Sequence, residues 1–442
     1  MSSLSPLLHD PWHTTLLRMA IPGVIGAVVM SSLQVVEVHF LSEHGPQVLA
    51  AVAVVLPLFI LQGMFSAGAI GGAISGSVAR ALGAGDKPRA SALLASALLI
   101  AVIGSCLMAL LVIQWGHHIY RWAGAEEALL PLAQEYAWWV FIAQPAYWLL
   151  NMLCSVLRGT GDMKRPAWAM SVTVLSYAVW AYLLLPATDA SDFAVMQSAG
   201  QAMALSFLFG LLSVLLLYQF GERPIALNLA DFNLAILRAV LRQGLLAASQ
   251  SLMTIAYSLI ATALFARYGL YWLAGYGLSV RLELIMVPVI FGIGGALIAL
   301  VGAYVGAGRR AEAIAIAWRG ILVNVVIVGG IGLVLAIWPS LWCQPMSDGE
   351  TTAQHCEASL RVIGPSYGFF ALGLGLYFAS QGLNTLIYPV AGAALRLLIV
   401  LAAFWFTTNS TPPSTLLWIV AAAVLSYGGV TAMALAFGPW RK

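Results

Sequence analysis

Long apolar segments follow one another along almost the whole chain, and they limit what it can fold into. A helix needs about 20 apolar residues to cross a bilayer. Hydrophobic residues make up 61% of the 442 and charged residues only 8%, against about 25% charged in soluble proteins. The segments lack the period-2 alternation of a β-barrel. The sequence therefore predicts an all-α, polytopic membrane protein with about twelve transmembrane helices, at 14–41, 48–79, 91–116, 131–156, 167–186, 195–219, 241–268, 273–303, 313–339, 359–380, 388–407 and 414–437.

Basic residues gather in alternate links between these segments, and such links are cytoplasmic in membrane proteins. They are Arg80, Lys87, Arg89, Arg158, Lys164, Arg165, Arg223, Arg238, Arg309, Arg310, Arg441 and Lys442. The other links are acidic, with Glu43, Glu126, Glu127, Asp189, Asp192, Asp348 and Glu350. Both termini are therefore predicted to be cytoplasmic. Because the net charge is only +3 and the bases lie at helix ends, we expect no nucleic-acid partner.

The two halves of the chain repeat at a constant offset of 223 residues. The paired landmarks are Gly83-Ala84-Gly85 with Gly306-Ala307-Gly308, Trp115 with Trp338, Gly159 with Gly382, and Pro166 with Pro389. A fixed offset is the mark of an internal repeat. It predicts two pseudo-symmetric six-helix lobes, 1–220 and 241–442, joined by a cytoplasmic linker at 221–240. An even helix number per lobe places the pseudo-twofold axis along the membrane normal, with a binding site between the lobes.

Three cytoplasmic motifs carry a family resemblance. Segment 157–166 reads LRGTGDMKRP and resembles the LRGxGDxxxP loop of multidrug and toxic compound extrusion (MATE) transporters. Segment 301–309 resembles the motif that follows helix 8 in that family. Segment 381–389 together with Arg396 resembles its helix 10–11 link. The triplet Arg281-Leu282-Glu283 is similar to the pattern of the DinF-like branch.

The resemblance implies a twelve-helix exporter with two lobes that alternates access to its binding site. Such proteins exchange protons or sodium for cationic, amphipathic compounds. We accordingly expect a monomer in the bilayer of the bacterial inner membrane, with small-molecule substrates, no cofactor and no resident metal.

Glu37 is the first candidate for ion coupling. Ionisable groups at membrane depth are costly and are often functional, and burial favours the neutral form of a carboxyl. Gln34 lies one turn earlier on the same face of the predicted helix. The family carries an acid here, usually Asp in a VDT-like sequence, where this chain has Val36-Glu37-Val38. The alternative is a glutamate near the outer helix end whose carboxylate reaches water.

Arg281 and Glu283 lie two residues apart in the predicted eighth helix, so they point to different faces. Each needs a partner on another helix or in a wet cavity. For Glu283 we consider both proton coupling and a structural ion pair. For Arg281 and Arg396 we favour a role in the structure of the C-terminal lobe.

The coupling ion is predicted to be the proton. Sodium-coupled family members often carry acids in helices 7 and 10, and the segments 241–268 and 367–381 contain none. A sodium site needs several hard oxygen ligands, so sodium is the weaker alternative.

Other candidate residues have two interpretations each. Trp138, Tyr147, Tyr257 and Met286 could line a cavity for flat cations, or they could simply pack between helices and at the membrane interface. In the loop motif, Arg158, Gly159, Gly161 and Asp162 are expected to support a tight turn and not to touch substrate. Cys343 and Cys356 share one outer loop and form either a disulfide or two free thiols.

Two other functions compete with drug export. A lipid-linked sugar flippase of the same superfamily would need a strongly cationic cavity, and few basic residues lie within the apolar segments. A membrane-embedded enzyme would need a catalytic set at membrane depth. Apart from His39, which lies near a helix end without an obvious partner, the histidines fall in termini or outer loops.

Overall fold

The computed structural model describes residues 7–8, 10–122, 124–186, 190–220, 225–347, 349–408 and 410–441. Asp189, Arg223, Asp348 and Lys442, which entered the charge pattern, lie outside the described residues, as does part of the expected linker.

The described chain is almost entirely helical, as predicted. Its α-helices are α2 Trp12–Leu41, α3 Pro46–Gly63, α4 Gly71–Gly83, α5 Lys87–Trp122, α6 Leu130–Ile142, α7 Gln144–Gly159, α8 Lys164–Leu184, α9 Asp192–Phe220, α10 Leu234–Ala266, α11 Leu270–Gly306, α12 Arg310–Ile337, α13 Ser340–Met346, α14 Glu350–Ile363, α15 Tyr367–Leu383, α16 Ile387–Phe406 and α17 Pro413–Ala436. A π-helical stretch, Met64–Ile70, joins α3 to α4, and 3-10 turns lie at Ser42–His44, Leu229–Asp231 and Gly364–Ser366.

Among the described residues, eleven helical segments are long and apolar enough to cross a membrane, and a bent pair makes a twelfth. That pair is α6 and α7, which meet at an angle of 47°. Pro145 stands in the first turn of α7, where its ring prevents α6 from running straight through. The predicted span 131–156 is therefore one crossing made of two helices.

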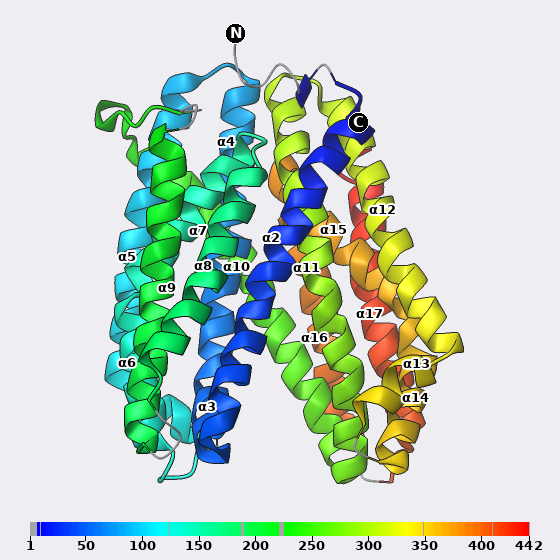
Figure 1. Ribbon diagram of the computed structural model, residues 1–442. Coiled ribbons are helices and arrows are strands. Elements are labelled where there is room, and N and C mark those ends of the chain that lie inside the picture. Colours follow the sequence, from blue (N-terminus) through cyan, green and yellow to red (C-terminus); the bar gives the residue numbers. More distant parts are fainter. Residues whose placement is uncertain are drawn as a thin grey trace.

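The helices form two bundles, and the repeat relates their boundaries (Figure 1). The helix α4 ends at Gly83 and α11 ends at Gly306, while α7 ends at Gly159 and α15 ends one residue after Gly382. Gly85 and Gly308 both adopt positive φ, 73° and 76°, in the turns that follow. The 223-residue offset therefore recurs in the helix ends and turns of the two bundles, while the lobe limits 1–220 and 241–442 stay a prediction. The helix α10 starts at Leu234, inside the segment expected to be linker.

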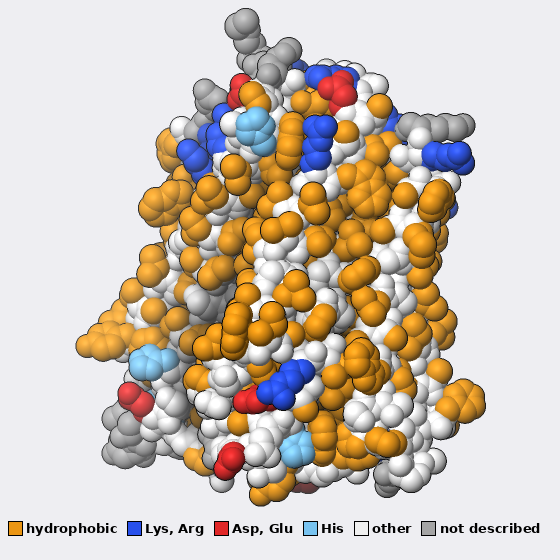
Figure 2. Space-filling model, turned by 90° about the vertical axis from the view of Figure 1, so that its right-hand side faces the viewer, with side chains coloured by type: hydrophobic (Ala, Val, Ile, Leu, Met, Phe, Trp, Pro, Cys, Tyr) orange, Lys and Arg blue, Asp and Glu red, His pale blue; other side chains and the backbone are white. Residues whose placement is uncertain are grey.

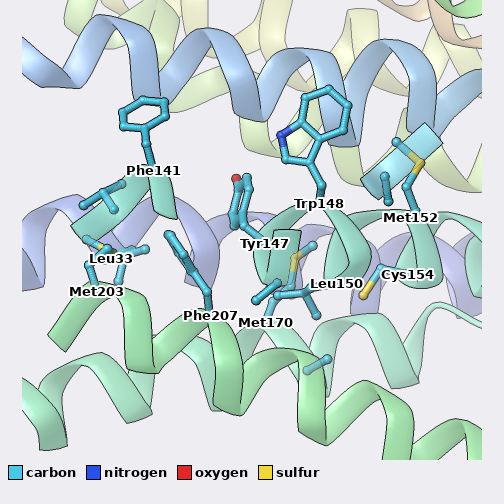
Figure 3. Packing of buried hydrophobic residues seen from close by; sticks show 14 of the residues in the cluster. Leu33, Phe141, Tyr147, Trp148, Leu150, Met152, Cys154, Met170, Met203 and Phe207 are labelled. Atoms are coloured by element: carbon cyan, nitrogen blue, oxygen red, sulfur yellow. The ribbon is translucent and has the colours of Figure 1, made fainter. Parts of the chain in front are cut away.

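Each lobe has its own apolar core. In the N-terminal lobe, Tyr147 and Trp148 of α7 pack with Phe207 of α9 and Met170 of α8 (Figure 3). A separate cluster in the C-terminal lobe includes Tyr257 and residues of α11, α15 and α17. Outside the cores, apolar side chains cover a broad belt, while basic side chains gather towards the end of the molecule at the top of Figure 2.

The helix α2 packs against α8 of its own lobe and against α11 of the other. The ribbons of the two bundles converge at the end where α2 begins and the chain ends, and diverge towards the opposite end (Figure 1). Close glycine contacts tie the lobes together near the converging end. A Cβ at Gly83 would lie 2.2 Å from the Ala303 carbonyl oxygen, and one at Gly23 would lie 2.8 Å from that of Gly292. Only glycine permits such approaches.

Candidate functional site

Glu37 is buried in the N-terminal lobe, with 3% of its surface exposed. Its carboxylate, on α2, accepts a hydrogen bond from the hydroxyl of Tyr136 on α6. The phenol of Tyr177 on α8 interacts electrostatically with Glu37, and the phenol of Tyr120 on α5 interacts in the same way with Tyr136. Both of their hydroxyls are buried and have no hydrogen-bond partner in the described chain. One carboxylate thus lies in an apolar lobe with phenols as its polar neighbours.

The structure does not place Glu37 as a surface residue that reaches water, which was the alternative interpretation. Gln34 is half-buried one turn away, and no hydrogen bond between Gln34 and Glu37 is found among the described residues. The partner of Glu37 is instead Tyr136, 99 positions further along the chain. Sequence reasoning missed Tyr136 because helical periodicity identifies neighbours within one helix and not across helices.

The C-terminal lobe buries a charge of the opposite sign. Arg396 of α16 is 1% exposed. Its guanidinium carbon lies 4.1 Å from the ring centre of Tyr257 on α10 and 4.7 Å from that of Tyr427 on α17. The Nε and Nη1 atoms have no hydrogen-bond partner in the described chain. The Tyr427 hydroxyl accepts a 3.1 Å hydrogen bond from the Gln250 amide.

The structure separates the other two charged candidates of this lobe. Arg281 is exposed, and Glu283 is half-buried on the same helix. The charge of Glu283 interacts electrostatically with Arg396 and with Tyr257. No ion pair involving Glu283, Arg281 or Arg396 is present in the described segments, so the structure does not support the structural ion pair that was one of two interpretations of Glu283.

The four proposed cavity residues lie in different surroundings. Tyr147 is buried with its ring centre 4.7 Å from that of Phe207 (Figure 3). Tyr257 and Met286 belong to the core of the other lobe. Trp138 is 45% exposed on α6. Packing therefore accounts for Tyr147 and Met286, and Tyr257 supports Arg396.

The loop motif 157–166 forms a tight turn between α7 and α8. Gly161 has a φ of 89°, and a Cβ at Gly159 would lie 2.7 Å from the Ser75 carbonyl oxygen. The Asp162 carboxylate accepts hydrogen bonds from the backbone N–H groups of Lys164 and Arg165 at 3.0 and 3.1 Å. Asp162 thus caps the start of α8.

Arg158, from the same motif, points into the protein. It is buried and donates a 2.7 Å hydrogen bond to the Ser155 hydroxyl. Its guanidinium lies 5.8 Å from the ring centre of Phe291 on α11. Arg158 borders a cavity of about 30 Å³ between α2, α8 and α11, which is room for about one water molecule.

Arg80 joins the two lobes, a role that the sequence did not indicate. Its Nη1 donates to the backbone carbonyls of Gln381 and Gly382 at 2.7 and 2.8 Å. Its Nη2 donates to the Ser77 hydroxyl and to the Gln243 amide oxygen at 2.9 and 3.2 Å. The sequence could not reveal this role, because the partners of Arg80 on other helices, Gln243, Gln381 and Gly382, lie 163 to 302 positions away.

Cys343 and Cys356 form a disulfide between α13 and α14. Cys106 is an exposed free thiol and Cys154 is a buried one. The helices α13 and α14, which this disulfide joins, lie towards the end of the molecule where the bundles diverge (Figure 1).

The family is decided by a match over both lobes. The MatE family model matches residues 22–183 and 247–406, most of the described helices. The chain belongs to the MatE family. Members of this family are transporters, so this MatE chain is a transporter and not an enzyme.

Individual relatives differ in their named cargo. A protein of Shewanella oneidensis named "FAD transporter" is 25% identical over 324 residues, 72% of this chain and 71% of the relative. The "Probable multidrug resistance protein NorM" of Thermotoga maritima is 18% identical over 377 residues, 85% of this chain and 81% of the relative. A solved structure described as "Crystal structure of MATE in the bent conformation" superposes on this chain with a TM-score of 0.88. The two chains are 22% identical, and the match covers 100% of this chain and 97% of that one. This last likeness establishes the fold.

Proposed function

We propose that this MatE protein is a secondary active exporter that exchanges protons for cationic, amphipathic compounds by alternating access. The observation that carries the proposal is the burial of Glu37. A buried carboxylate needs compensation, either by a proton or by a positive charge. No ion pair of Glu37 is present in the described structure, and its recorded partner is a phenol that donates to it. A proton and a cationic substrate would therefore compete for one carboxylate.

The proposed coupling runs through α2. This helix carries Glu37 and packs against both α8 and α11, so a change at the carboxylate reaches the contact between the lobes. Protonation removes the attraction for a cation and favours its release. The proton and the cation each shift the equilibrium between the inward-open and outward-open states only to the extent that they bind one state more tightly than the other.

The proposed orientation places the converging end of the bundles in the cytoplasm of a bacterium, with both termini there. The described basic residues Arg80, Lys87, Arg158 and Arg309 lie at helix ends on that side. The inter-lobe contacts of Arg80 would then close the cytoplasmic side, leaving the opposite side to open.

The test is transport by purified protein in proteoliposomes with an imposed proton or sodium gradient. The cargo panel contains fluorescent cations, FAD because of the Shewanella relative, and a fluorescent lipid for the flippase alternative. We expect cation transport driven by the proton gradient alone. Transport that follows only the sodium gradient would refute proton coupling, and movement of the lipid alone would refute drug export.

A further inference from the structure

Arg396 carries a positive charge and forms no ion pair with a carboxylate in the described chain. An arginine side chain stays protonated in proteins, and an unpaired charge shielded from water is strongly unfavourable. Arg396 is nevertheless 1% exposed, and its Nε and Nη1 have no partner. The lobe therefore maintains a cation with unused hydrogen-bond donors.

The surrounding side chains stabilise the charge but do not accept its hydrogen bonds. The rings of Tyr257 and Tyr427 offer their faces to the guanidinium at 4.1 and 4.7 Å, which is a cation–π arrangement. The Gln250 amide nitrogen donates a hydrogen bond to the Tyr427 hydroxyl. What is missing is an acceptor in the plane of the guanidinium.

Glu283 is an anionic residue of the same lobe. Its charge acts on Arg396 and Tyr257, yet the two residues form no ion pair in the described structure. Glu283 therefore leaves the donors of Arg396 free, while its negative charge opposes the approach of a second anion.

We propose that Arg396 binds the carboxylate or phosphate group of a molecule that enters the C-terminal lobe. A planar guanidinium recognises these groups by paired hydrogen bonds in its own plane, and no hydrogen bond from Arg396 is found in the described chain. Calling that molecule a cargo rests on the proposed transport function; the binding of an anion by Arg396 does not. The two lobes then present opposite charges to a cargo, Glu37 in one and Arg396 in the other.

The experiment measures equilibrium binding to the purified full-length protein in nanodiscs, without any gradient. Flavin fluorescence compares riboflavin with riboflavin 5′-phosphate, which share a ring system and differ in one phosphate group. Thermal shifts compare benzoate with benzamide and add inorganic phosphate. We expect at least one anion to bind about tenfold more tightly than its neutral counterpart, as charge-assisted bonds to arginine predict. Equal binding within both pairs, with no effect of phosphate, would overturn the proposal.

Three variants locate the effect. Arg396→Gln should abolish the preference for the anion, and Arg396→Lys, which keeps the charge without the planar fork, should weaken it. Glu283→Gln should strengthen anion binding because it removes a nearby negative charge that opposes the anion. Arg281→Gln, at an exposed arginine of the same lobe, should change nothing. An anion preference that survives in a folded Arg396→Gln or Arg396→Lys protein would place the site elsewhere and refute the assignment.

Inorganic phosphate distinguishes the two sources of the anion. If phosphate alone displaces riboflavin 5′-phosphate, the site takes free anions; if it does not, the aromatic part of the cargo is also required. Because binding is measured without a gradient, Arg396 can fail this test while proton-driven transport through Glu37 succeeds, and the reverse also holds.

Discussion

Arg80 in the N-terminal lobe donates a 2.7 Å hydrogen bond to the backbone carbonyl of Gln381 in the C-terminal lobe. The same nitrogen also reaches the Gly382 carbonyl. Backbone carbonyls cannot move aside as side chains do, so these bonds hold α4 against the end of α15. The two lobes are thereby fastened where their helices converge.

Replacing Arg80 should loosen this contact. Hydrogen bonds from a charged donor contribute roughly 1.5–3 kcal/mol, so Arg80→Ala should favour separation of the lobes by about that much. Spin labels on the exposed positions Ala84 and Ala311 would report it as a shift to longer distances. Lys87→Ala, at an exposed neighbouring base, is the control. Unchanged distances in Arg80→Ala would show that packing alone closes this end.

The close approach of α2 and α11 should not tolerate a methyl group. A Cβ at Gly292 would lie 2.3 Å from the Val24 nitrogen, so Gly292→Ala should force the helices apart and cost about 1–3 kcal/mol. A lower thermal midpoint of the purified protein would show this. Gly277→Ala in the same helix meets nothing within 4 Å and should leave stability unchanged or slightly higher. Equal midpoints for the two variants would contradict the argument.

The helices and their repeat could be predicted because both depend on local sequence. Apolar length gave the spans, and the turns at Gly85 and Gly308 demand the same positive φ, so glycine marks both repeats. The bend between α6 and α7 was missed, although Pro145 is its local signal.

The two buried charges of the site could be predicted from the sequence, but their partners could not. The cost of burial singles out Glu37 and Arg396 as unusual, whichever partners they have. Their partners, Tyr136 and Tyr427, come from helices far along the chain, and no spacing rule connects them. An exposed Trp138 and a buried Tyr147 likewise look the same in sequence, since lipid and a protein core are equally apolar.

The disulfide should be present in the purified protein. Labelling of the denatured chain should reach two thiols, Cys106 and Cys154, and all four of the cysteines after reduction. A cross-link over a loop of this size raises the free energy of the unfolded chain by roughly 3 kcal/mol. The double variant Cys343→Ser with Cys356→Ser should therefore lower the thermal midpoint. Four labelled thiols without reductant, in protein from oxidising cells, would contradict the pairing.

Tyr136 should matter for transport through its hydroxyl alone. Tyr136→Phe keeps the ring in the core and removes the hydrogen bond to Glu37. A buried carboxylate that loses its donor is less well oriented and less well compensated, so the proton-driven transport rate should fall several-fold. Tyr182→Phe, on the exposed face of α8, should transport normally. A wild-type rate for Tyr136→Phe would mean that this phenol only packs.

Glu37→Gln tests the mechanism itself. The amide has nearly the volume of the carboxyl and still accepts a hydrogen bond from Tyr136, so the fold should persist, as thermal unfolding would show. The variant can neither take up nor release a proton at this position, and it cannot attract a cation by charge. Proton-driven export of a fluorescent cation should therefore stop, while Glu37→Asp, which retains the acid, should export partially. Glu43→Gln, at an exposed acid just beyond α2, should behave like the wild type.

If Glu37→Gln exports at the wild-type rate under a proton gradient, the carboxylate does not couple transport. Glu283→Gln in the same liposomes then shows whether coupling belongs to the other lobe.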